Sequence, residues 1–283
     1  MKEKIKLTSD SSCDLTEELM AKSGVVICPI AIILGDEEKY DTIDIDAEGV
    51  IEFYKKTGKL PKTAATSKEK YIEFFKEQSE GGYTIIHFCI SSKASSCYNN
   101  AVMAAKEFDN VYVIDSSALS GGQGLQIMKA AEIIKNTDKS AKEIAEELQN
   151  SVQKTQLSFV VDTMEFLQKG GRCSALAAVS AKLLKIHPSI YNKDGGLVVQ
   201  KKYMGGMARC LTQYVQDLAA EYKDYDDTIA FVTHSPSDKE LVYLVMEKAK
   251  EFFHFKEIYE TFAGSTVTSH CGKNTIGLLF LNK

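Results

Sequence analysis

Short hydroxyl-rich loops occur where apolar segments of this 283-residue chain end. Residues 63–67 precede a predicted helix, while residues 91–96 and 115–117 follow two predicted strands. Small donors at the amino-terminal ends of helices suit a carboxylate or a phosphate, because four backbone N–H groups there have no partner within the helix. These loops therefore predict an anion-binding site.

Thr63 and Ser95 are the hydroxyl residues best placed to hold such an anion. Ser95 stands where the helix predicted over residues 96–108 begins, so it is equally suited to cap that helix. Capping and anion binding use the same geometry and do not exclude each other. Thr63 has no helix of its own to cap, because Thr66 is better placed, and a turn hydroxyl is its simplest alternative role.

His270 and Arg172 are the candidates to complement a negative charge. His270 lies among small residues in the segment 266–272, between two apolar strands, where the backbone can approach a ligand closely. The other four histidines are weaker site candidates. His87 lies in a predicted strand and His187 precedes a proline, whereas His234 follows a strand and His254 follows a helix. Arg172 follows two glycines and suits either a bidentate pair with an anion or a turn carbonyl.

An acyl hydrolase is the alternative reading of the same residues. Ser95, Asp115 and His270 can be drawn as a catalytic triad, and Cys271 can be drawn as a nucleophile beside His270. The sequence has no G-x-G-x-x-G fingerprint, no Walker A loop and no G-x-S-x-G elbow. We therefore expect a binding protein without a catalytic residue of its own.

Composition excludes several other classes of protein. A formal net charge of −5 argues against nucleic acid, which needs a basic surface. The most apolar run, residues 25–34, is too short to span a membrane and contains Pro29. The seven cysteines show no C-x-x-C pair or zinc-ligand spacing, which fits reduced thiols and no metal. We expect a cytoplasmic protein.

Strands and helices alternate over the first two-thirds of the chain. The predicted strands are residues 5–7, 25–34, 84–90 and 111–114. Two predicted helices begin near residues 15 and 66. The other predicted helices cover residues 46–56, 96–108, 124–136 and 140–154. Near-continuous apolar strands separated by helices indicate a doubly wound parallel sheet, so the first domain, residues 1–155, is predicted to be α/β.

The pattern changes after about residue 155. Residues 193–196 (Lys-Asp-Gly-Gly) give a hairpin signal between strands at 189–192 and 197–201. The other predicted strands are 157–161, 228–233, 257–263 and 276–281, and the predicted helices are 175–185, 207–222 and 238–253. This mixture predicts an α+β second domain over residues 156–283.

Six segments, taken in order, resemble motifs of the DegV family, the fatty-acid-binding subunits of bacterial fatty acid kinase. They are T-x-D-S-x-x-D-L at residues 8–15, P-x-T-S-Q-P-S at 61–67, I-S-S-x-L-S-G-T-Y at 90–98, V-x-D-S at 113–116, L-x-x-G-G-R at 167–172 and T-H-x-G-P-G at 269–274. Their order and spacing hold from about residue 5 to 281, so the resemblance covers nearly the whole chain.

The resemblance implies a long-chain fatty acid such as palmitate, bound between or inside the two domains, with no cofactor. It assigns the carboxylate to Thr63 and Ser95, and it places His270, as an imidazolium, and Arg172 near the head group. It also implies a separate ATP-dependent fatty acid kinase as partner, with the subunit carrying the acyl phosphate. It implies neither nucleic acid binding nor stable insertion into a membrane.

The chain departs from these motifs at three places. Ala64 and Ala65 replace the Ser-Gln pair of the second motif, which removes one hydroxyl. Lys273-Asn274 replaces the Pro-Gly pair after the histidine and adds a cation. The third motif has substitutions at Ala94, Ser96 and Cys97.

Overall fold

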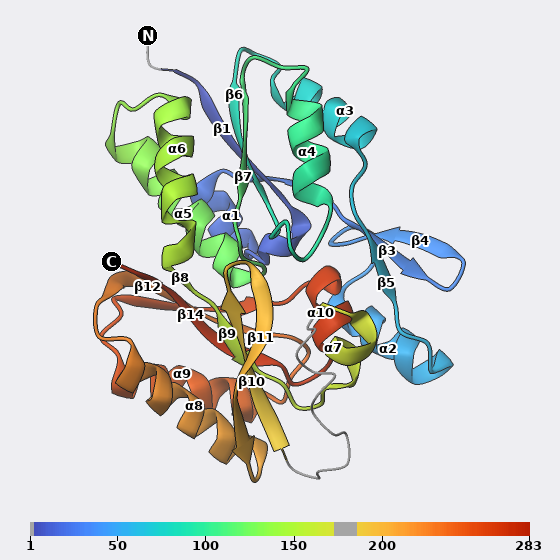
Figure 1. The fold of residues 1–283 in the computed structure, drawn as a ribbon, viewed down its shortest axis with the longest axis vertical. Coiled ribbons are helices and arrows are strands. Elements are labelled where there is room, and N and C mark those ends of the chain that lie inside the picture. Colours follow the sequence, from blue (N-terminus) through green and yellow to red (C-terminus); the bar gives the residue numbers. More distant parts are fainter. Residues whose placement is uncertain (1–2, 173–185) are drawn as a thin grey trace.

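A four-stranded parallel sheet forms one half of the molecule, at the top of Figure 1. In this computed structural model, which describes residues 3–172 and 186–283, the strand order is β2-β1-β6-β7. The strands are β1 (Ile5–Asp10), β2 (Val26–Cys28), β6 (Thr84–Cys89) and β7 (Val111–Asp115). Parallel neighbours need crossover connections, and helices supply most of them here.

Helices cover both faces of this sheet. One face packs against α1 (Glu17–Ser23), α5 (Gly121–Asn136) and α6 (Ala141–Ser151), and the other against α3 (Lys68–Gln78) and α4 (Cys97–Ala105). Side chains of β6 alternate accordingly: Ile86 and Phe88 join the first core, and Ile85 and Cys89 join the second. The prediction of a doubly wound α/β unit is confirmed.

A seven-stranded mixed sheet forms the other half. Its order is β11-β10-β9-β14-β12-β13, with β8 paired to β14. The strands are β8 (Thr155–Gln156), β9 (Ser158–Val160), β10 (Ile186–Lys193), β11 (Gly196–Met204), β12 (Tyr225–His234), β13 (Glu257–Phe262) and β14 (Ile276–Asn282). The predicted hairpin is present, and Asp194 and Gly195 both adopt the positive φ angles that a tight two-residue turn requires.

The two faces of the mixed sheet pack against different partners. Helices α8 (Met207–Glu221) and α9 (Lys239–Phe252) cover one face, at the bottom of Figure 1. The other face contributes Phe159, Phe231 and Leu279 to the core that also contains α5. The two halves therefore share apolar side chains, and their meeting place is shielded from water.

A small antiparallel sheet joins the halves at the right of Figure 1. It contains β3 (Ala31–Leu34), β4 (Glu37–Tyr40) and β5 (Lys62–Ala64), and α2 (Ala47–Thr57) lies between β4 and β5 in the chain. The single strand predicted over residues 25–34 is wrong, because the chain leaves the parallel sheet at Pro29 and starts β3 at Ala31. Proline has no N–H to continue a ladder of hydrogen bonds.

Two short helices lie in segments where no helix was predicted: α7 (Glu165–Gly170) and α10 (Ser265–Cys271). Elements of six and seven residues are too short to establish a hydrophobic period. Two helices also begin later than expected: α1 begins at Glu17 and is capped by Thr16, and α3 begins at Lys68 and is capped by Ser67 in place of Thr66. The helix predicted over residues 175–185 lies outside the described residues.

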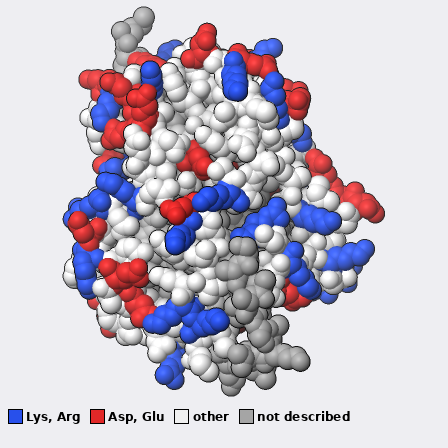
Figure 2. All heavy atoms as spheres, in the orientation of Figure 1, with Lys and Arg blue, Asp and Glu red and all other residues white. Residues whose placement is uncertain are grey.

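The surface in the orientation of Figure 2 carries acidic and basic side chains interspersed with wide uncharged areas. Among the helices of the described ranges, none is both long enough and apolar enough to cross a membrane. Nor do these ranges contain a group of three or more His, Cys, Asp or Glu side chains that could hold a metal ion.

Candidate functional site

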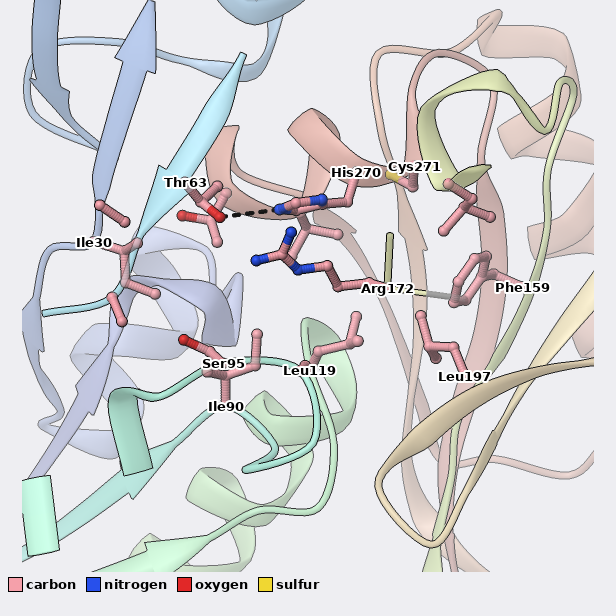
Figure 3. A pocket seen from close by; sticks show the side chains of 16 residues that line it. Ile30, Thr63, Ile90, Ser95, Leu119, Phe159, Arg172, Leu197, His270 and Cys271 are labelled. Atoms are coloured by element: carbon pink, nitrogen blue, oxygen red, sulfur yellow. Dashed lines mark hydrogen bonds between the residues drawn. The ribbon is translucent and has the colours of Figure 1, made fainter. Parts of the chain in front are cut away.

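A partly enclosed pocket lies where the loops of the parallel sheet meet α10 and the mixed sheet (Figure 3). Its volume is about 60 Å³. Most of its lining is apolar and includes Ile30, Ile90, Leu119, Phe159, Leu197 and Val267. Its polar side chains are Thr63, Ser95, Arg172, Thr266 and His270. The four residues singled out in the sequence therefore line one pocket, although they come from distant parts of the chain.

Thr63 and His270 form the central contact of the polar end. Thr63 is held in β5, where it pairs with Ile32 of β3, and its Oγ1 lies 3.0 Å from His270 Nε2. His270 Nδ1 is buried and has no hydrogen-bond partner among the residues that the structure describes. Because a buried N–H is rarely left unpaired, we assign the ring proton to Nε2, which then donates to Thr63. That tautomer leaves the hydroxyl hydrogen of Thr63 free to point into the pocket.

The imidazole of His270 is neutral at pH 7 in these surroundings. Burial, and to a smaller extent the positive charge of Arg172, lower the pKa of His270 to about 4. The imidazolium expected from the sequence is therefore not the favoured form. Arg172 is the only lysine or arginine among the described residues that line the pocket.

Arg172 follows the left-handed residue Gly171 at the end of α7. Its Nη1 donates to the carbonyl of Gly170 at 2.7 Å, which matches the turn-carbonyl reading. In Figure 3 the guanidinium points toward the end of the pocket that holds Thr63 and Ser95. The remaining N–H groups of the fork are suited to an anion at that position.

Glycines let α7 approach α10 closely. A Cβ added to Gly170 would lie 2.7 Å from His270 Nδ1, and one added to Gly272 would lie 2.7 Å from the ring of Phe166. The segments that resemble L-x-x-G-G-R and T-H-x-G-P-G thus pack directly on each other. The absence of a side chain at Gly170 and Gly272 therefore allows α7 to pack closely against α10 and its imidazole.

Ser95 lies just before α4, as expected, but that helix is shorter than predicted and begins at Cys97. The Ser95 hydroxyl accepts from Cys97 N–H at 3.3 Å and donates to Cys97 Sγ at 3.2 Å. It therefore binds the first turn of the helix while lining the pocket. Thiol sulfur is a weak acceptor, so an anion would compete well for this hydroxyl hydrogen.

Two buried carboxylates bind the first turn of α10, and the sequence reasoning did not find this role for either. Asp14 Oδ1 accepts from Gly264 N–H at 2.9 Å, and Asp14 also accepts from the hydroxyl of Ser120. Asp41 accepts from Ser265 N–H at 2.9 Å, Thr266 N–H at 3.2 Å and the Thr266 hydroxyl at 2.6 Å. Asp14 belongs to the first motif, whereas no pattern in the sequence marks Asp41.

The contacts of the hydrolase candidates do not form a triad within residues 3–172 and 186–283. Asp115 accepts from the backbone N–H groups of Ser92 and Ser117, and His270 contacts Thr63. Burial raises the pKa of the Cys271 thiol to about 12, so it is not a thiolate near neutral pH. In the described part of the chain, neither the Ser95 hydroxyl nor the Cys271 thiol donates a hydrogen bond to a general base.

A second, smaller cavity lies next to the pocket, on the side of the mixed sheet. Its volume is about 30 Å³ and its lining is largely apolar. Four residues line both spaces: Leu119, Phe159, Val267 and Cys271. The pocket thus adjoins a second apolar space, and together the two spaces suit a hydrocarbon chain.

Several known proteins are similar to this chain in sequence and in fold. A model of the DegV family, described as uncharacterised proteins, matches residues 4–283. A DegV domain-containing protein of Clostridium acetobutylicum is 29% identical over 99% of this chain and 100% of its own. Two solved structures are each 25% identical over 99% of this chain with a TM-score of 0.85. They are DegV of Bacillus subtilis, described as a fatty acid binding protein (100% covered), and a stearic acid-binding protein of Eubacterium ventriosum (98% covered). The chain belongs to the DegV family.

Proposed function

We propose that this protein binds a long-chain fatty acid such as palmitate, with the carboxylate held by the hydroxyls of Thr63 and Ser95. The observation that carries the proposal is that these hydroxyls, Arg172 and His270 all line one pocket whose remaining walls are mostly apolar. A carboxylate at the polar end would accept from neutral donors and from the guanidinium. The fatty acids bound by solved relatives support this class of ligand.

His270 acts on the ligand through Thr63 in this proposal. The neutral ring donates from Nε2 to Thr63 Oγ1, so the Thr63 hydroxyl directs its hydrogen to the carboxylate. Arg172 supplies the positive charge and orients the head group. The low pKa of His270 keeps its ring a fixed donor over the neutral pH range.

The acyl chain would extend from the polar end into the second cavity. Burial stabilises a chain by about 0.8 kcal/mol per methylene, so the tail supplies affinity and the head supplies orientation. Spaces of about 60 and 30 Å³ are small for a long chain. We therefore expect the side chains that line both cavities to move apart when the ligand enters.

We further infer a separate fatty acid kinase as partner, which phosphorylates the bound carboxylate. The resemblance to the subunits of bacterial fatty acid kinase supports this step, and ATP supply then places the pair in the cytoplasm. The same hydroxyl and guanidinium donors suit an acyl phosphate, which offers more acceptor oxygens than a carboxylate. The protein would thus present the acid and carry the product.

Native mass spectrometry of the purified, untreated protein tests the proposal. We expect a retained fatty acid at near one-to-one occupancy, identified by extraction. Protein that carries no fatty acid and shows no mass shift with added palmitate would contradict it. Addition of ATP and a purified fatty acid kinase then tests the second step, since acyl phosphate formation should require both proteins.

A further inference from the structure

The helix that carries His270 cannot hold its own position. α10 has seven residues, and isolated helices shorter than about 12–15 residues are marginal in water. Its N-cap residue is Gly264, which has no side chain to accept from the first turn. Contacts with other elements must therefore fix where α10 lies.

The carboxylate of Asp41 provides three hydrogen bonds that help to fix α10. The residue is completely buried, and it receives two backbone N–H groups and one hydroxyl of α10. The Ser11 hydroxyl also donates to it at 2.9 Å and accepts from Ile30 N–H at 3.1 Å. Because Ile30 and Thr266 both line the pocket, Asp41 joins two of its walls from behind.

Helical spacing connects this contact to the imidazole. Thr266 and His270 are four residues apart, so they lie on the same side of α10, and both line the pocket. A shift of Thr266 relative to the small sheet would therefore shift His270 relative to Thr63. Asp14 accepts from Gly264, the residue before α10, and limits the same motion. Neither carboxylate lines the pocket itself.

We propose that Asp41, assisted by Asp14, is a positioning residue of the head-group site. Its carboxylate fixes the first turn of α10, so that His270 donates to Thr63 and the Thr63 hydroxyl faces the ligand. The effect on the ligand rests on the proposed function, whereas the effect on the imidazole is a property of the protein alone. The two effects can be measured separately.

The variant Asp41→Asn keeps the size of the side chain and removes its charge and one acceptor oxygen. Asp226→Asn is the matched control, because Asp226 also accepts from the backbone N–H and the hydroxyl of one threonine, Thr228, away from the pocket. Affinities are measured for palmitic acid and for hexadecanol, which has the same chain without the carboxylate. The His270 ring is followed by ¹⁵N NMR in ligand-free protein.

Asp41→Asn should weaken palmitic acid binding at least tenfold and hexadecanol binding less than threefold. In the ligand-free protein it should bring the two ring nitrogen shifts of His270 toward each other, as both tautomers become populated. Asp226→Asn should change neither. Equal losses for the acid and the alcohol, or unchanged ring shifts, would overturn the positioning role and leave Asp41 as a structural residue.

Failure of the proposed function gives a different result. If the wild-type protein binds no palmitic acid but Asp41→Asn still alters the His270 ring, the ligand assignment fails and the positioning role stands. If Asp41→Asn does not fold, Asp14→Asn takes its place, since it changes only the side chain that accepts from Gly264 and Ser120. It should show the same selectivity for the acid with a smaller loss, and the absence of that selectivity counts against the proposal.

Discussion

At the scale of single residues, the chemistry of the pocket depends on how one neutral imidazole directs one hydroxyl. His270 is paired with Thr63 through Nε2, and its buried Nδ1 faces the backbone of Gly170. Protonation of Nδ1 would leave a buried N–H without an acceptor in residues 3–172 and 186–283, which agrees with the low pKa of His270. The ring is therefore suited to donate a fixed hydrogen bond.

Fatty acid affinity should be nearly constant between pH 6 and 8. The pKa of His270 is about 4 in the protein, so the ring carries no charge at either limit. If binding required the imidazolium, the protein would take up a proton with the ligand, and affinity would fall tenfold for each unit of pH rise. Calorimetric titration at pH 6, 7 and 8 distinguishes the two cases. A tenfold loss of affinity per unit of pH rise would mean that the bound state contains the charged imidazolium.

Ser95→Ala should weaken fatty acid binding by about 1 kcal/mol or more, because one donor to the carboxylate is lost. The free energy of unfolding should change little, since Cys97 is the only hydrogen-bond partner of this hydroxyl among the described residues. Calorimetric titration with palmitic acid measures the effect, and Ser92→Ala on the same loop serves as a control outside the pocket lining. Unchanged affinity would remove Ser95 from the site.

At the scale of elements, the predictable parts are the long ones. The strands β6, β7 and β14 and the helices α8 and α9 have clear apolar runs or periods, and the sequence places them within a few residues. The small elements around the pocket lack that signal, because β5, α7 and α10 are fixed by contacts with distant segments. Motif order located Thr63, Ser95, Arg172 and His270, whereas Asp41 gave no signal because its role depends on partners more than two hundred residues away.

The seating of α7 on α10 should be sensitive to a single methyl group. In Gly170→Ala the new Cβ would lie 2.7 Å from His270 Nδ1, so either the ring or α7 must move. Alanine normally stabilises a helix by up to about 1 kcal/mol relative to glycine, so a loss of affinity in this variant can be assigned to the clash with His270. We expect at least a tenfold loss of palmitic acid affinity in a titration.

Gly206→Ala is the control for that change, because a Cβ there meets no atom within 4 Å. It should bind palmitic acid like the wild-type protein. If Gly170→Ala also binds normally, the close approach of α7 has no part in placing the imidazole.

At the scale of the whole molecule, the site exists only where the two halves meet. Thr63 and Ser95 come from the small sheet and the parallel-sheet half, whereas His270 and Arg172 follow residue 155 in the chain. Asp14 and Asp41 cross the same junction to α10, so the halves are joined by buried polar bonds as well as apolar packing. The domain boundary near residue 155 stays a prediction, since a shared core ties the two halves together.

The contribution of His87 to the stability of the folded chain should fall as the pH is lowered, because its ring is buried without charge. Its Nδ1 lies 2.9 Å from Thr8 Oγ1, and the rings of Tyr71 and Phe75 pack against it. Its Nε2 has no hydrogen-bond partner among the described residues. Burial lowers the pKa of His87 to about 3, whereas an unfolded histidine titrates near 6.5. Between these values only the unfolded chain takes up the proton, so this group costs about 1.4 kcal/mol for each unit of pH decrease.

Other buried groups shift stability in the opposite direction, so the test compares two proteins. Burial raises the pKa values of Asp10 and Asp14, so as the pH falls the folded state takes up their protons at a higher pH than the unfolded chain does. These contributions are common to the wild-type protein and to His87→Phe, and they cancel in the difference between the two. Urea unfolding from pH 7 to 4.5 should show the wild-type protein losing stability relative to the variant, by about 1.4 kcal/mol per unit below pH 6. Parallel curves for the two proteins would mean that His87 is accessible to protons in the folded state, and that the aromatic residues around it do not exclude water.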